Sequence, residues 1–90
     1  MPITFDPAKR SATLAQRGLD FADAEVVFDG LTYTLPDERR DYAEERWQTY
    51  GLLAGRLMMV VWTGRGADRH VISMRKCNDR ETSRFKGKLD

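Results

Sequence analysis

The sequence predicts one domain of the α+β class, residues 1–90, with two N-terminal helices, a four-stranded, mostly antiparallel sheet and a C-terminal helix. Apolar residues recur at helical spacing before Gly30, and from Leu31 they alternate with a period of two, as in a strand. Short turns join the strand-like segments, which makes an antiparallel meander the simplest arrangement. A chain this short buries enough surface for about one core.

The N-terminal segment Ile3–Phe5 fits either an extra short strand or an anchored tail. Asp6 and Pro7 then favour the start of a helix, because aspartate accepts hydrogen bonds from free backbone N–H groups and proline fits the first turn. We expect this helix to end near Arg17, where Gly18 can adopt the left-handed conformation that stops helices.

The second helix is predicted over residues 21–29, because Phe21, Ala24 and Phe28 repeat at the spacing of a buried helical face. The segment LMMVVWT at residues 57–63 is apolar without alternation, which indicates a central strand covered on both faces. The four strands are predicted over residues 31–35, 46–53, 57–63 and 69–76, with a polar, charged loop over residues 36–44.

The end of the chain is predicted to form a strand followed by a short helix. Asn78 and Glu81 lie three residues apart, the spacing of a capping box, and predict a closing helix that ends near Gly87. Alternation divides the side chains of the preceding strand between two faces, with Ile72 and Met74 on one and Val71, Ser73 and Arg75 on the other.

Composition excludes several classes of protein. The single cysteine, Cys77, excludes an internal disulfide framework and fits a reducing cytoplasm. It follows two cations that would lower its thiol pKa, but we interpret it as a small residue at a strand end. With His70 and Cys77 as the soft ligands, neither a metal site nor a cofactor is expected. The longest apolar run, residues 57–62, is too short for a membrane span.

The charge distribution points to an anion-binding surface near the C-terminus. Residues 63–90 carry a net charge of +4 and residues 1–62 a net charge of −3. Arg75 has a planar fork that matches phosphate, and Lys76 is a compact second cation beside it. In the alternative interpretation, both cations pair with Glu44 or Glu45 across the sheet, or face solvent.

Several motifs together resemble the BrnT toxins, small ribonucleases of type II toxin–antitoxin systems. The motifs extend from Phe5 to about Phe85 and comprise FDPAKR, GLDFADAEVVF, TLPDERRDYAEERWQTYG, GRLMMVVWT and VISMRK with a following DRE. The resemblance implies a RelE-like fold and metal-independent RNA cleavage by attack of the 2′-hydroxyl on the adjacent phosphate. It also implies a BrnA-like antitoxin as partner, with DNA bound only through the antitoxin.

The resemblance also implies roles for individual residues. Arg75 would stabilise charge in the transition state, and Lys76 would bind phosphate. Glu45 is a candidate general base, and Arg46 a second phosphate clamp. Further contacts with RNA are expected from Lys9, Arg17 and Arg80.

One departure from the family pattern supports a second hypothesis. Many relatives have Lys-His-Gly at the end of the first helix, where this sequence has Gln16-Arg17-Gly18. If that histidine takes part in catalysis, this chain would be an inactive toxin relative that acts as a protein- or RNA-binding module.

Overall fold

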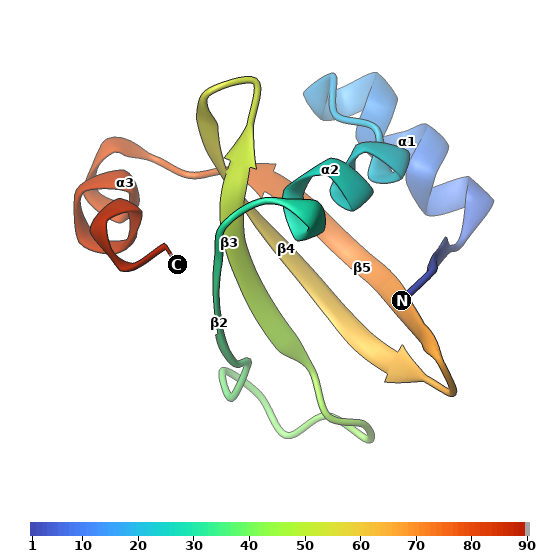
Figure 1. Cartoon of the computed structure of the whole chain (residues 1–90). Helices are drawn as coiled ribbons and strands as arrows, with labels where there is room; N and C mark the ends of the chain where they lie inside the picture. Colours follow the sequence, from blue (N-terminus) through green and yellow to red (C-terminus); the bar gives the residue numbers. More distant parts are fainter. Residues whose placement is uncertain (90) are drawn as a thin grey trace.

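The computed structural model describes residues 1–89 and, over these residues, has one five-stranded sheet and three α-helices, which confirms the α+β class. The strand order is β1-β5-β4-β3-β2 (Figure 1). The sheet has five strands and not four, because β1 pairs in parallel with β5, whereas the other neighbours are antiparallel. The elements are β1 (Ile3–Phe5), α1 (Pro7–Arg17), a 3-10 helix (Phe21–Asp23), α2 (Ala24–Asp29), β2 (Thr32–Pro36), β3 (Trp47–Leu53), β4 (Arg56–Arg65), β5 (Asp68–Lys76), α3 (Asp79–Phe85) and a last 3-10 turn (Lys86–Lys88).

The first helix begins and ends as predicted. Asp6 caps α1 by accepting a hydrogen bond from a backbone N–H of the first turn (2.8 Å). Gly18 closes α1 in the left-handed conformation, with a φ of 67°. The predicted second helix is divided into a 3-10 turn, Phe21–Asp23, and α2. An ion pair between Arg10 and Asp20 (2.8 Å) joins α1 to this second helical segment.

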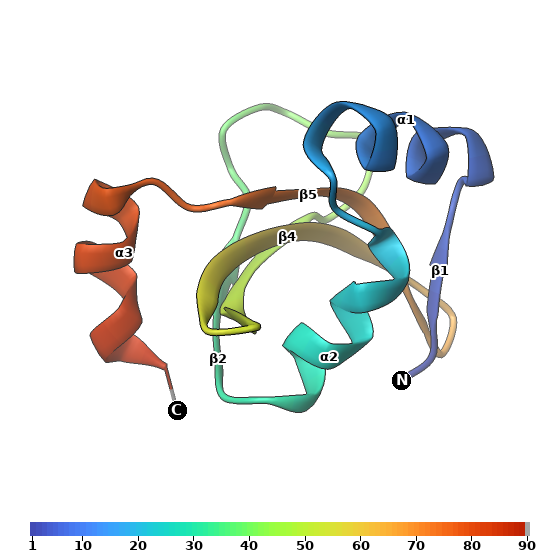
Figure 2. The same cartoon turned by 90° about the horizontal axis from the view of Figure 1, so that it is seen from above.

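Apolar side chains cover both faces of the sheet. Figures 1 and 2 show α2 and α3 on opposite sides of the sheet, with α1 next to β5. The α2 face has a cluster of Leu19, Phe21, Ala24, Val27, Met58, Val60, Val71 and Met74. The α3 face has a cluster of Tyr50, Leu57, Met59, Val61, Cys77 and Phe85. Since β4 supplies residues to both clusters, it is the doubly covered central strand that its apolar sequence predicts.

A bulge in β5 changes which residues face the core. The register shifts between Val61 and Trp62 of β4, and Ile72 is the extra residue of β5. The prediction of strict alternation was therefore wrong at this point. Val71 shares the α2 face with Met74, and Ile72 packs against the cluster on the α3 face.

The connection between β2 and β3, residues 37–46, is a long charged loop at one end of the sheet (Figure 1). Among residues 1–89, no helix has both the length and the apolar character that a membrane span requires. The finer expectation of a RelE-like arrangement rests on the sequence resemblance and stays a prediction.

Candidate functional site

A pocket of about 320 Å³ lies on the α3 face, between the sheet and α3, and is called here the arginine pocket. Directly opposed residues of antiparallel strands share a face of the sheet. Met59 of β4 is opposite both Tyr50 of β3 and Arg75 of β5, so these three side chains lie in a row across the floor of the pocket. The pocket is lined by Leu35, Arg39, Gln48, Tyr50, Met59, Arg75, Arg80, Glu81, Arg84 and Phe85.

Arg75, on the floor of the pocket, is held by a carboxylate from α3. Its Nη1 donates to Glu81 Oε1 (2.8 Å) and its Nη2 to Glu81 Oε2 (2.6 Å). Glu81 also forms the predicted capping box with Asn78, in which each side chain accepts a hydrogen bond from the other residue's backbone N–H. The hydrogen bonds from Arg75 hold the pKa of Glu81 at about 2 and raise the pKa of Arg75, so both groups are charged at neutral pH.

A second arginine is held in a similar way at the β2 side of the pocket. Arg39 donates from Nε to Asp37 Oδ1 (2.7 Å) and from Nη2 to Asp37 Oδ2 (2.8 Å). The side chain of Asp37 is fully buried, whereas that of Arg39 is 55% exposed. The Arg39 guanidinium therefore has one edge on a buried carboxylate, and the hydrogen bonds between them hold the pKa of Asp37 at about 2.

Tyr50 connects the floor of the pocket to the same buried carboxylate. Its hydroxyl donates to Gln48 Oε1 (3.1 Å), and Gln48 Nε2 donates to Asp37 Oδ1 (3.1 Å). The ring of Phe85 stacks on the Tyr50 ring with centroids 4.2 Å apart and holds α3 against the sheet. Burial raises the pKa of Tyr50, which keeps the phenol protonated at neutral pH.

The pocket has a strong excess of positive charge. Among residues 1–89, four arginines line it (Arg39, Arg75, Arg80 and Arg84), against one lining carboxylate, Glu81. A concave surface with this charge and with arginine forks in fixed orientations suits a phosphodiester backbone.

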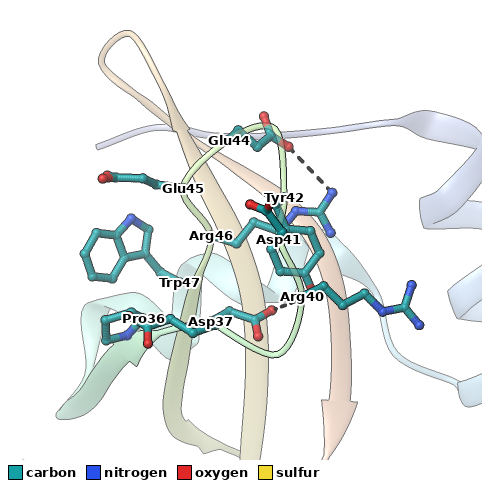
Figure 3. A pocket seen from close by; sticks show the side chains of 10 residues that line it. Pro36, Asp37, Arg40, Asp41, Tyr42, Glu44, Glu45, Arg46 and Trp47 are labelled. Carbon is teal, nitrogen blue, oxygen red and sulfur yellow. Dashed lines mark hydrogen bonds and ion pairs between the residues drawn. The ribbon is translucent and has the colours of Figure 1, made fainter.

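A separate pocket of about 310 Å³, the loop pocket, lies within the β2–β3 loop (Figure 3). Arg46 pairs there with Glu44 (3.7 Å), and its guanidinium lies 4.0 Å from the centroid of the Tyr42 ring. Figure 3 shows the side chains of Glu45 and Arg46 extending to opposite sides of the chain. Both residues line this pocket and lie outside the lining of the arginine pocket, so the predicted base and second clamp are not next to Arg75.

The other predicted residues are divided among several surfaces. Arg80 lines the arginine pocket together with Arg75. Lys76 is exposed and pairs with Met58 of the α2-face cluster, so it lies on the other face of the sheet from Arg75. The expectation that Arg75 and Lys76 clamp one phosphate together was therefore wrong.

The two predicted contacts from α1 also lie outside the arginine pocket. Lys9 is exposed in the first turn of α1. Arg17 is exposed at the end of the same helix and donates from Nη1 to the backbone carbonyl of Met74 (2.9 Å). Both cations belong to α1, which packs against β5 and supplies none of the residues that line the arginine pocket.

Two further expectations about the end of β5 need correction. The acid that pairs with Arg75 is Glu81 from α3, and neither Glu44 nor Glu45 from the loop, since Glu44 pairs with Arg46. Cys77 is buried, and burial raises the pKa of its thiol to about 11, where the neighbouring cations were expected to lower it. Its buried position agrees with the interpretation of Cys77 as a small strand-end residue.

Sequence reasoning missed five polar residues of the arginine pocket: Arg39, Gln48, Tyr50, Glu81 and Arg84. A signal was present for two of them, because the alternation of β3 places Gln48 and Tyr50 on one face. Arg39 gave no such signal, since it lies in a loop without periodicity and reaches the pocket only through its bond to Asp37.

Comparison with curated protein sequences gave no match. Comparison with protein families gave a match to the family described as the ribonuclease toxin BrnT of type II toxin–antitoxin systems, over residues 5–81 of the 90-residue chain. This match extends from the last residue of β1 to the first turn of α3 and includes the Arg39–Asp37 and Arg75–Glu81 pairs. A toxin of this class has ribonuclease activity and an antitoxin partner. The chain therefore belongs to the BrnT family of type II toxin–antitoxin ribonuclease toxins.

Proposed function

We propose that this protein is a metal-independent endoribonuclease, that RNA binds in the arginine pocket, and that cleavage of RNA inhibits translation and growth. One observation carries the proposal. Two arginines, Arg75 and Arg39, line one pocket, and the carboxylates of Glu81 and Asp37 hold their guanidinium groups in place. Such groups can stabilise charge as it develops on a phosphate without reorganising during the reaction.

The substrate supplies the nucleophile, so the protein has to position the RNA and stabilise the charge that develops on the phosphate. The 2′-hydroxyl of the substrate loses its proton and attacks the adjacent phosphorus, the bond to the 5′ oxygen of the next nucleotide breaks, and that oxygen takes up a proton. The products are a 2′,3′-cyclic phosphate and a 5′-hydroxyl. Arg75 and Arg39 would stabilise the negative charge on the pentacovalent phosphorane. Arg80 and Arg84 would bind the flanking phosphates. With a pKa of about 2, Glu81 is a weak proton acceptor, so its role would be to orient Arg75.

The position of Arg17 argues against the alternative of an inactive relative. That hypothesis depends on Arg17 standing where relatives have a histidine. Arg17 bonds to the Met74 carbonyl and lies outside the arginine pocket. The departure therefore leaves the proposed site intact.

We further propose that the antitoxin is BrnA-like and that it inhibits the toxin by covering the arginine pocket. An excess of four guanidinium groups over one carboxylate favours an acidic segment of the partner. Contact with DNA would then be made by the antitoxin.

The proposed function is tested by incubating the purified protein with single-stranded RNA in EDTA and identifying the product ends. We expect cleavage with 2′,3′-cyclic phosphate and 5′-hydroxyl ends, and no cleavage of the same sequence with 2′-O-methyl groups. A requirement for divalent metal, or cleavage of the 2′-O-methyl substrate, would contradict the mechanism.

A further inference from the structure

The β2–β3 loop contains a fully buried carboxylate that does not itself line the arginine pocket, Asp37. We propose that Asp37 is a positioning residue for the ribonuclease site. Asp37 holds Arg39 directly, and it holds Tyr50 through Gln48. This inference rests on the proposed function and adds a residue that lies outside the lining of the arginine pocket.

The hydrogen bonds of Asp37 satisfy both of its oxygens. Oδ1 accepts from Arg39 Nε (2.7 Å) and from Gln48 Nε2 (3.1 Å). Oδ2 accepts from Arg39 Nη2 (2.8 Å) and from the Tyr42 hydroxyl (3.3 Å), a bond also drawn in Figure 3. Burial of an ionised carboxylate is costly unless it is paired and hydrogen-bonded. Because both oxygens of Asp37 accept hydrogen bonds, its charge is compensated by these specific neighbours.

Two of the partners of Asp37 extend into the arginine pocket. A guanidinium has five N–H donors, and Asp37 uses the Nε–H and one Nη2–H of Arg39, which leaves about three for a ligand. Gln48 transmits the second contact, because one end of its amide is bonded to Asp37 and the other accepts from the Tyr50 hydroxyl. One buried charge therefore orders a cation at the rim of the pocket and a phenol on its floor.

Loss of the Asp37 charge should release Arg39 as a mobile side chain. The Arg39 side chain is 55% exposed, so Asp37 supplies the main restraint on the position of its guanidinium. A mobile arginine still attracts phosphate, but it must be ordered again in each transition state, which lowers the rate of the chemical step.

The test compares cleavage by Asp37→Asn, Arg39→Ala and the double variant. We expect Asp37→Asn to lower kcat by up to about 100-fold, with a smaller change in KM. In the Arg39→Ala background, Asp37→Asn should have a much smaller effect, because the directly bonded arginine is gone and only the contact through Gln48 remains. Equal losses in both backgrounds would overturn the proposal. Asp41→Asn, an exposed residue of the same loop, is the control for charge and should keep wild-type activity.

Two measurements keep the inference distinct from the proposed function and from a folding defect. Asp37→Asn should also weaken binding of an uncleavable 2′-O-methyl RNA less in the Arg39→Ala background than in the wild-type background. This result is expected even if the wild-type protein does not cut RNA. In the wild-type protein, NMR should show slow solvent exchange of the Arg39 Nε–H and fast exchange of the Nε–H of exposed Arg40. Equal, fast exchange at both residues, or additive losses of affinity, would overturn the role of Asp37 whatever the activity.

Discussion

The two faces of the sheet differ in what their side chains do. On the α2 face, Phe21, Val27 and Val60 are fully enclosed by apolar neighbours. On the α3 face, an apolar cluster stands beside a pocket lined by four arginines. The same strands serve both faces, since β5 contributes Met74 to the core and Arg75 to the pocket. The α2 face therefore carries an apolar core, and the α3 face combines a second apolar cluster with the charges that the proposed chemistry needs.

The largest expected effect is on stability, from a truncation on the α2 face. Phe21 is 1% exposed, so Phe21→Ala should lower the free energy of unfolding by about 3–5 kcal/mol. This is a large part of the about 5–15 kcal/mol typical of a native protein. Urea denaturation followed by circular dichroism measures the change. A loss below about 1 kcal/mol, the size expected at a surface position, would mean that the face is not the main core.

The next largest effect is on activity, from a substitution on the α3 face. Arg75→Ala should lower kcat for RNA cleavage by about 10²–10³-fold, the loss seen when one preorganised donor is removed from a transition state. The change in stability should be small, because a half-exposed ion pair contributes only about 0–1 kcal/mol.

Lys76→Ala is the matched control for Arg75→Ala, because it removes the neighbouring cation on the opposite face of the same strand. Its cleavage rate should stay close to that of the wild-type protein. If Lys76→Ala loses as much activity as Arg75→Ala, the functional difference between the two faces is not real.

Acid should weaken the interactions of the α3 face by protonating its paired carboxylates. Asp37 and Glu81 have pKa values near 2 in the folded protein, below their ordinary values of 3.8 and 4.5. Their stabilisation is therefore complete above about pH 4.5 and is lost as the pH falls towards 2. The free energy of unfolding, measured across this pH range, should change less with pH in Glu81→Gln than in the wild-type protein. The matched variant Val60→Ala should be less stable at every pH but keep the wild-type slope.

The smallest effect concerns the salt dependence of RNA binding. If Arg84 contacts a phosphate, Arg84→Ala should reduce the slope of log affinity against log salt concentration by about 0.7, the value for one phosphate contact on a single strand. Arg65→Ala, in the exposed β4–β5 hairpin, is the control and should leave the slope unchanged. Equal slopes for wild type and Arg84→Ala would remove Arg84 from the site.

The helices and the central strand could be predicted from the sequence more fully than the site. Caps at Asp6 and Asn78 and the apolar run of β4 are local signals, and the structure has the helices and the central strand that they predict. The bulge at Ile72 was missed because an extra residue in a strand resembles ordinary alternation until its partner strand is known.

The site was only partly predictable, because its charges are paired over distances that a local pattern does not show. Arg75 was predicted from its residue type and its place at a strand end, but its partner Glu81 was not. Lys76 was grouped with Arg75 because the two are adjacent in sequence, although adjacent residues of a strand point to opposite faces. Arg39 reaches the pocket from a loop, where periodicity gives no information.

NMR chemical-shift mapping with an uncleavable 2′-O-methyl RNA tests most directly whether RNA binds on the α3 face. We expect the largest shifts at the pocket residues Arg39, Tyr50, Arg75 and Arg80, with little change at Lys9, Arg17 and Lys76. Shifts centred on Lys9, Arg17 and Lys76, with the arginine pocket unaffected, would contradict the proposed site.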